Sequence, residues 1–144
     1  MCLNVEPGEW IRVAEKEITF YKRVDVIEPS SGEHPFFSSP YRSYRYYTKE
    51  NLLGKSLEIE GSQPSVIHKG FHGYTTREAA RRAQFLEEII LECIIPIGAE
   101  YCYGSHGEVV SNQMRICALS NSTFYNRFTN VTKPRLDKIL NRLK

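Results

Sequence analysis

The fold depends most on one apolar stretch near the middle of the chain, Ile89-Ile90-Leu91-Glu92-Cys93-Ile94-Ile95-Pro96. The stretch is almost uninterrupted and rich in β-branched side chains, which is typical of a strand that is covered on both faces of a sheet. Pro96 and Gly98 end it, because proline cannot donate a hydrogen bond to a ladder and glycine favours a turn. We therefore predict a central strand over residues 89–95.

The segment before this strand predicts a helix. Thr75 and Glu78 have the spacing of a capping box, in which a hydroxyl and a carboxylate bind free amide groups of the first turn. Apolar residues then recur at helical spacing and would share one face: Ala79, Ala83, Leu86 and Ile90. We predict a central helix over about residues 76–88, which can lie close to a sheet because alanine side chains are small.

Shorter apolar or alternating segments predict the remaining strands. These are residues 10–14, 18–26, 56–60, 99–103, 108–111 and 113–119, of which the fourth and fifth are expected to form a hairpin. Residues 28–40 contain three prolines and are expected to be a loop, as are the residues before the helix. The predicted fold class is α+β: a mostly antiparallel sheet with one central helix and a C-terminal amphipathic helix.

The C-terminal helix is expected over residues 132–144. Its apolar side chains recur at intervals of three and four residues: Leu136, Ile139, Leu140 and Leu143. We predict a single α+β domain over residues 1–131, followed by this basic helix. Its basic face is a candidate surface for a nucleic acid, a protein partner or a second copy of the chain; the alternative is a docked helix with solvated charges.

Composition is typical of a globular protein of one domain. The chain has 144 residues, of which 41% are hydrophobic and 25% charged, and its formal net charge is +2. These values argue against a disordered chain and against a generally basic one. No apolar run has the length of a signal peptide or approaches the ~20 residues of a membrane span, and the four cysteines lack CxxC spacing. We expect free thiols, no membrane and a cytoplasmic location.

One candidate ligand site is the segment Gly70-Phe71-His72-Gly73-Tyr74. Its glycines allow close approach to a ligand, while the aromatic rings offer stacking faces and His72 a titratable donor. The alternative is a tight connection whose phenylalanine fills the core.

A second candidate lies within residues 41–47, where two arginines alternate with four tyrosines, among them Tyr44 and Arg45. Guanidinium groups bind phosphate and rings stack on bases, so the segment suits a nucleotide or a single-stranded nucleic acid. An edge strand in which arginine packs on tyrosine explains the same residues equally well.

Glu108 opens a predicted strand and is a candidate general base or ribose ligand; the alternative is an exposed hairpin glutamate. No metal site is predicted, because the four histidines lack ligand spacing to a cysteine or carboxylate. Cys102 and His106 do not form a credible nucleophile pair, since no third orienting group is evident.

Over nearly its whole length the chain resembles uncharacterised small proteins of bacterial viruses, prophages and gut bacteria. The shared segments are residues 20–24, 39–41, 69–74 (Lys-Gly-Phe-His-Gly-Tyr), 93–98 (Cys-Ile-Ile-Pro-Ile-Gly) and 110–114 (Val-Ser-Asn-Gln-Met). The resemblance implies the cytoplasm of a bacterial host and no particular activity.

Residues 18–24 and 69–118 also resemble, more loosely, the order of elements in ADP-ribosyltransferase folds. This resemblance implies that Arg23 holds a phosphate or ribose of NAD, that Tyr74 or Phe71 stacks on the nicotinamide, and that Glu108 polarises the ribose 2′-hydroxyl. The Ser-Thr-Ser motif of that family does not occur in the sequence, and Glu108 lacks the paired upstream Gln or Glu.

The leading hypothesis is therefore a non-catalytic binding protein of phage or mobile-element type, whose ligand is a nucleotide-like small molecule or a host protein. The residues expected to line its pocket are Arg23, Tyr44, Arg45, Phe71, His72 and Tyr74. The alternative is an NAD-dependent mono-ADP-ribosyltransferase that uses Glu108. Apart from NAD under this alternative, the sequence leaves both the cofactor and the oligomeric state open.

Overall fold

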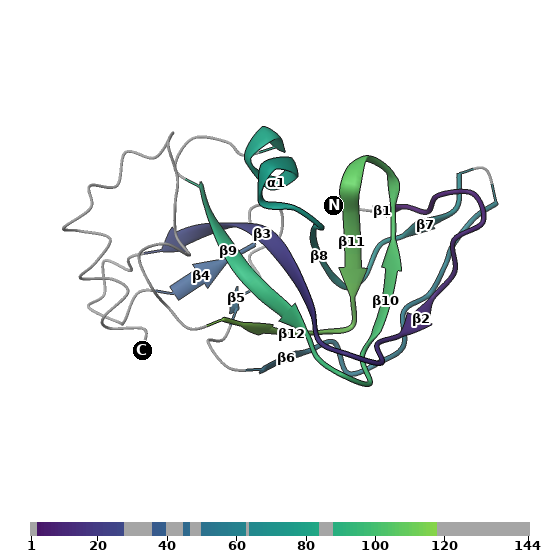
Figure 1. Cartoon of the computed structure of the whole chain (residues 1–144), viewed down its shortest axis with the longest axis horizontal. Coiled ribbons are helices and arrows are strands. Elements are labelled where there is room, and N and C mark those ends of the chain that lie inside the picture. Colours follow the sequence, from purple (N-terminus) through teal and green to yellow (C-terminus); the bar gives the residue numbers. More distant parts are fainter. Residues whose placement is uncertain are drawn as a thin grey trace.

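Antiparallel strands dominate the described chain, and one helix lies against them (Figure 1). The computed structural model describes residues 3–27, 36–39, 45–46, 50–62, 64–83 and 88–117. The strands are β1 (Leu3–Asn4), β2 (Arg12–Val13), β3 (Ile18–Ile27), β4 (Phe36–Ser38), β5 (Arg45–Tyr46), β6 (Glu50–Leu52), β7 (Val66–Ile67), β8 (Phe71–Tyr74), β9 (Glu88–Ile95), β10 (Glu100–Tyr103), β11 (Glu108–Ser111) and β12 (Gln113–Ile116). The helix is α1 (Arg77–Ala83), and a short 3₁₀ turn spans Ser105–Gly107.

The main sheet has ten strands in the order β2-β10-β11-β8-β3-β9-β12-β6, with β4 paired to β3 and β5 paired to β4. Strands β1 and β7 form a separate pair, and every strand pair is antiparallel. The predicted α+β class, with a mostly antiparallel sheet and a central helix, is thereby confirmed.

The ladder closes on itself at Asn112, the one residue between β11 and β12. Strand β11 pairs with β8 and β12 pairs with β9, and both β8 and β9 flank β3. Asn112 stabilises this bend with its backbone and its side chain: its N–H donates to the Glu100 carbonyl at 3.1 Å, and its Oδ1 accepts from the Glu100 N–H at 2.8 Å. The sheet therefore curls around its own core instead of remaining flat.

The core lies inside this curl, along the long β3–β9 pair. Eight residue pairs connect the two strands, from Ile18–Ile95 to Asp25–Glu88. The main buried cluster includes Phe20, Val24, Phe37, Phe71, Ile89, Leu91, Cys93, Ile95, Val109 and Met114. The prediction of a strand covered on both faces is confirmed for β9, whose residues 88–91 are all buried.

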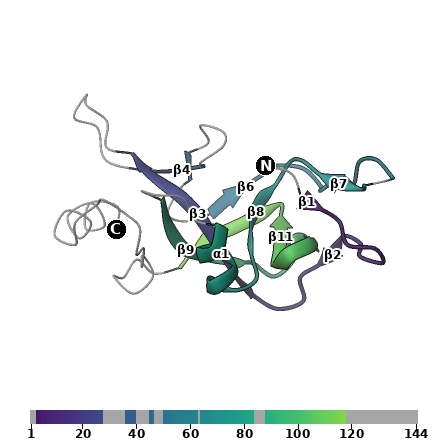
Figure 2. The ribbon, with the colours of Figure 1, turned by 90° about the horizontal axis from the view of Figure 1, so that it is seen from above.

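Helix α1 covers the opposite side of β3, β8 and β9 (Figures 1 and 2). Ala79 and Ala80 pack with Tyr74 and Ile90 in a cluster of their own. The helix cap is Thr76, whose Oγ1 accepts from the Ala79 N–H at 3.1 Å, so the predicted capping box that starts at Thr75 is wrong by one residue. The predicted helix end at residue 88 is also wrong, because Glu88 already belongs to β9.

The residues before the helix form strands β7 and β8, where a loop was predicted. Gly70 and Gly73 are required there by close strand packing. A Cβ atom on Gly70 would lie 2.5 Å from Val110 Cγ2, and one on Gly73 would lie 2.6 Å from both Phe20 Cδ2 and the Tyr21 carbonyl. Glycines are the usual sign of a loop, so this pattern concealed a buried strand.

Three further predictions need correction. Strand β4 lies inside residues 28–40, which were predicted to be loop throughout. Residues 56–60 do not form the predicted strand; only Glu60 forms a bridge, with Val66. The strand in this part of the chain is β6, at residues 50–52. Strand β2 is shorter than the predicted segment 10–14.

Two predictions fall outside the described residues: the helix over 132–144 and hence the boundary after residue 131. Within the part of the chain that the structure describes, no helix has both the length and the apolar character needed to span a membrane. Cys93, Cys102 and Cys117 are free thiols, and burial raises the pKa of Cys93 to about 12.

Candidate binding groove

Arg23, the predicted cofactor ligand, is buried beneath α1. Its Nη1 lies 3.3 Å from Glu88 Oε1 and also donates to the Ala83 carbonyl at the end of the helix. The side chains of Arg23 and Glu88 are only 5% and 4% exposed. The guanidinium therefore connects β3, β9 and α1, and a bound phosphate would have to compete with the carboxylate.

Tyr74 and Glu108 lie directly opposite each other on β8 and β11. Tyr74 is buried in the cluster under α1, whereas Glu108 is half-buried. Burial raises the pKa of Glu108, and the positive charges of His106 and Arg23 oppose that shift. The structure thus brings Arg23, Tyr74 and Glu108 to one region next to the helix.

Phe71 is separated from this region by strand alternation. It lies in the main core, where its ring meets Tyr46 edge to face at a centroid distance of 6.3 Å. The side chain of Lys22 is also buried there, since its ammonium donates to the His72 carbonyl and lies 4.9 Å from the centre of the Tyr46 ring.

His72 is held by two backbone carbonyls. Its Nδ1 lies 3.1 Å from the Gly70 oxygen and its Nε2 lies 3.1 Å from the Ile67 oxygen. Burial, followed by the charge of Lys22, lowers the pKa of His72 to about 4. The ring is therefore neutral at pH 7, and only one of its nitrogens can donate to a carbonyl.

The remaining predicted residues lie elsewhere. Arg45 is exposed on β5, and Tyr44 falls outside the described residues. The five described members of the predicted ligand set thus lie at separate places on the helix side, in the interior of the sheet and on β5. Neither of the two pockets described below is lined by any of these five.

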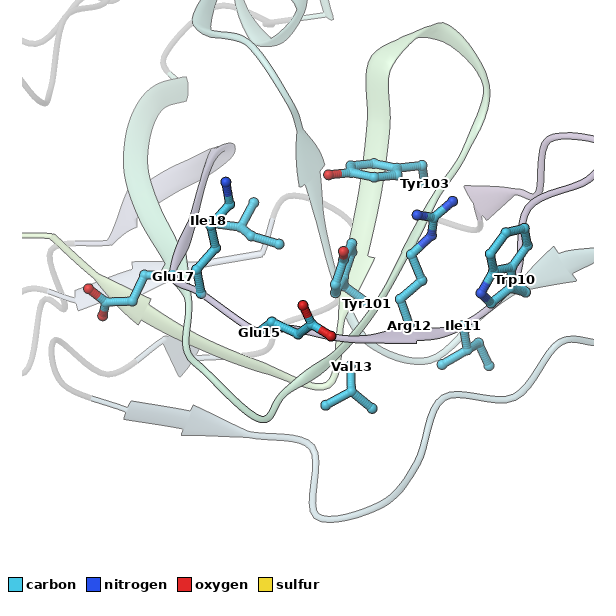
Figure 3. Close-up of a pocket in the computed structure, with 10 residues that line it drawn as sticks. Trp10, Ile11, Arg12, Val13, Glu15, Glu17, Ile18, Tyr101 and Tyr103 are labelled. Carbon is cyan, nitrogen blue, oxygen red and sulfur yellow. The ribbon is translucent and has the colours of Figure 1, made fainter.

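A groove of about 1020 Å³ lies at another place, at the β2 end of the sheet (Figure 3). It is lined by the segment from Trp10 to Ile18, apart from Ala14, and by Tyr101 and Tyr103 of β10. In the β2–β10 register Arg12 faces Tyr101. Figure 3 shows Arg12, Tyr101 and Tyr103 on one side of the strands and Val13 directed to the opposite side.

Aromatic rings and one guanidinium form the wall of the groove. Arg12 Cζ lies 4.4 Å from the centre of the Trp10 ring, and Arg12 Nη2 lies 3.3 Å from Glu9 Oε2. Tyr101 and Tyr103 meet edge to face with a centroid distance of 5.5 Å and an interplanar angle of 76°. Burial, followed by the charge of Tyr101, raises the pKa of Tyr103, so its hydroxyl remains a donor at neutral pH.

Two features of this wall are not explained by contacts within the described chain. Trp10 is 58% exposed, although its indole ring is large and mostly apolar. Arg12 Nε has no hydrogen-bond partner among the described residues, but it is buried and therefore out of reach of a ligand. The exposed indole of Trp10 is the feature of this wall that a ligand can contact.

The groove carries mixed charge. Glu15 and Lys16 are exposed, while Glu17 forms an ion pair with Arg115 of β12. Because Glu9 neutralises Arg12 and Arg115 neutralises Glu17, the wall has no strong positive field of the kind that attracts polyanions.

The sequence contained one signal for this groove: the chain's single tryptophan lies two residues before an arginine on a predicted strand. That spacing places both side chains on one face. The partner tyrosines are far along the chain, and only the β2–β10 pairing shows that they line the same groove.

A second, smaller pocket of about 40 Å³ lies between residues 55–60 and 68–69. His68 Nε2 and Glu60 Oε2 are 3.2 Å apart at its wall, and a hydrogen bond and the charge of Lys69 lower the pKa of Lys55. Within the described ranges no group of three or more His, Cys, Asp and Glu side chains is placed to hold a metal ion.

Comparison of the chain with protein-family models, with curated proteins and with solved structures found no match.

Proposed function

We propose that this chain is a non-catalytic binding protein, of the type expected for a phage or mobile element, and that the groove between β2 and β10 is its recognition surface. The observation that carries the proposal is the exposed Trp10, with Arg12 stacked on its ring and a tyrosine pair on the same wall.

The physical argument is one of exposure and size. An exposed indole leaves a large apolar area in water, and stacking a ligand against it removes that area and adds aromatic contact. The groove volume of about 1020 Å³ lies at the upper end of the range in which proteins enclose small molecules. It can also accept side chains of a protein partner, since Trp, Tyr and Arg are the residues that dominate binding energy at interfaces.

Binding without catalysis fits the chemistry of the wall. The described residues that line the groove include neither cysteine, serine nor histidine, so they offer no activated nucleophile of the common types. Two of their charged side chains are instead held in ion pairs, Arg12 with Glu9 and Glu17 with Arg115.

Trp10 itself provides the test, because it is the only tryptophan of the chain and its emission reports on the groove alone. We would titrate the protein with NAD, ADP-ribose, cyclic nucleotides, short oligonucleotides and a set of synthetic peptides. A groove ligand changes Trp10 emission in a saturable way, and the change weakens in Arg12→Ala and Tyr103→Ala.

Leu52→Ala is the matched control, since Leu52 is as exposed as Trp10 but lies on β6 at the other end of the sheet. A response of equal size in Arg12→Ala, or none from any ligand, would overturn the proposal.

One observation favours the alternative, NAD-dependent mono-ADP-ribosyl transfer: Glu108 begins β11, as the resemblance implies, and lies opposite Tyr74. Incubation with labelled NAD and lysate tests it. Transfer that is lost in Glu108→Ala would support the transferase, and the absence of transferred label would remove it.

A further inference from the structure

We propose that the occupant of the groove is an extended, basic peptide segment of a protein partner, which pairs with β2 as an additional strand. The inference rests on the proposed function of the groove and adds the class of ligand and its mode of binding.

The first argument is that β2 is the terminal strand of the sheet order. The Ala14 N–H donates to the Ala99 carbonyl at 2.8 Å and the Ala14 carbonyl accepts from the Gly98 N–H at 2.8 Å, so Ala14 is directed toward β10. Alternation then directs the N–H and C=O of Val13 away from β10.

The second argument is that the side chains around this edge suit a strand. Trp10 and Arg12 line the groove, and Val13, which borders it, is 59% exposed and directs its side chain away from Arg12 and the two tyrosines (Figure 3). A peptide strand beside β2 directs alternate side chains to the two faces of the sheet. An aromatic residue of the peptide can enter the groove against Trp10, Tyr101 and Tyr103, while its neighbour covers Val13.

The third argument is charge. Along residues 6–17, which form this edge, the acidic side chains outnumber the basic ones: Glu6, Glu9, Glu15 and Glu17 against Arg12 and Lys16. Glu6 and Glu15 are exposed and have no ion-pair partner among the described residues. A peptide with lysine or arginine complements this edge, whereas the phosphates of a nucleic acid would be repelled by it.

The experiment selects seven-residue peptides from a random library on the full chain and measures the strongest by Trp10 emission. We expect the selected sequences to be rich in Lys, Arg, aromatic and β-branched residues. Binding should weaken about tenfold when the edge hydrogen bond is removed.

Val13→Pro removes that bond, because proline lacks the outward N–H while the bonds to β10 come from neighbouring residues. Val13→Ala is its matched control, since it shortens the side chain and keeps the donor. A second test leaves the protein unchanged: the same peptide with alternate backbone N-methyl groups should bind at least tenfold more weakly, and the amide of Val13 should gain protection from hydrogen exchange with the unmodified peptide only.

The outcomes separate the two proposals. Equal binding of the methylated peptide, or no selected peptide above background, overturns strand addition. If nucleotides or oligonucleotides still change Trp10 emission in that case, the groove is a binding site for a different ligand. If neither class does, the proposed function fails as well. Light scattering of the free chain identifies the remaining occupant, a second copy: a dimer that Val13→Pro dissociates would replace the partner peptide and overturn the inference.

Discussion

Arg12 and Arg23 carry the same guanidinium group in two regions with opposite surroundings. Arg23 is 5% exposed and lies between Glu88 and the Ala83 carbonyl under α1. Arg12 is 36% exposed, stacks on Trp10 and keeps one buried nitrogen without a partner. The interior arginine connects three elements of the fold, whereas the groove arginine lines a groove and is partly exposed to a ligand.

Residue type alone is therefore a weak guide to whether a residue binds a ligand. Arg23 was the predicted ligand because of a family resemblance, whereas Arg12 was predicted only as part of a strand. A buried ion pair costs desolvation and requires both partners, so removing one leaves a charge that water cannot reach. An exposed arginine on an aromatic ring contributes little to stability and can contact a ligand. Three substitutions and one change of pH test which residues stabilise the fold and which are available to a ligand.

The largest effect is expected from Glu88→Gln, which leaves Arg23 buried without its carboxylate. We expect the free energy of unfolding to fall by about 3–5 kcal/mol, measured by urea denaturation. Glu17→Gln, at the half-exposed pair with Arg115, is the control and should cost less than about 1 kcal/mol. Similar losses in the two variants would mean that the buried pair has no special role.

The next effect is the pH dependence caused by His72. Because its pKa in the fold is about 4 and its ordinary value is 6.5, the unfolded chain binds more protons between these two values. Stability should therefore decrease as pH falls from 6.5 toward 4, by at most about 3 kcal/mol.

Urea denaturation of the wild type and of His72→Gln at several pH values measures this contribution. The slope should be smaller in His72→Gln than in the wild type. Identical slopes in the two proteins would show that His72 is not the titrating group.

A smaller effect is expected from Gly73→Ala, which tests whether this glycine serves packing or a ligand. An added Cβ would lie 2.6 Å from Phe20 and from the Tyr21 carbonyl, so the strands must shift. We expect a loss of about 1–3 kcal/mol in thermal or urea unfolding. An unchanged stability together with lost ligand binding would restore the predicted pocket around residues 70–74.

The smallest effect on stability is expected from Arg12→Ala. Loss of the contact with Trp10 and of the exposed pair with Glu9 should cost below about 1 kcal/mol, while the emission of Trp10 should change because its neighbour is removed. A loss as large as that of Glu88→Gln would place Arg12 among the residues that hold the fold together.

Local patterns were sufficient for part of the fold. The apolar run of β9, the β10–β11 hairpin and the alanine-rich helix were predicted because each depends on neighbouring residues. Strand β8 was missed, since Gly73 within it and Gly70 just before it allow close contacts with Phe20 and Val110, which belong to other strands. The start of α1 was misplaced because Thr75 and Thr76 are both good caps, and only the observed contact distinguishes them.

The candidate site likewise depends partly on local sequence and partly on contacts between distant segments. Glu108 was expected to open a strand, and it does, but its neighbour Tyr74 and the charge of Arg23 come from register and packing. The groove was not predicted, because it requires the segment around β2 to pair with β10.

Hydrophobic periodicity and small side chains act over a few residues, so the α+β class, the central strand and the approximate place of the helix follow from the amino-acid sequence alone. The bend of the sheet at Asn112, the burial of Arg23 and the edge position of Arg12 are seen only in the fold. These features depend on pairings between segments that are distant in the chain. Their energy comes from burial and from hydrogen bonds that exist only once those segments meet.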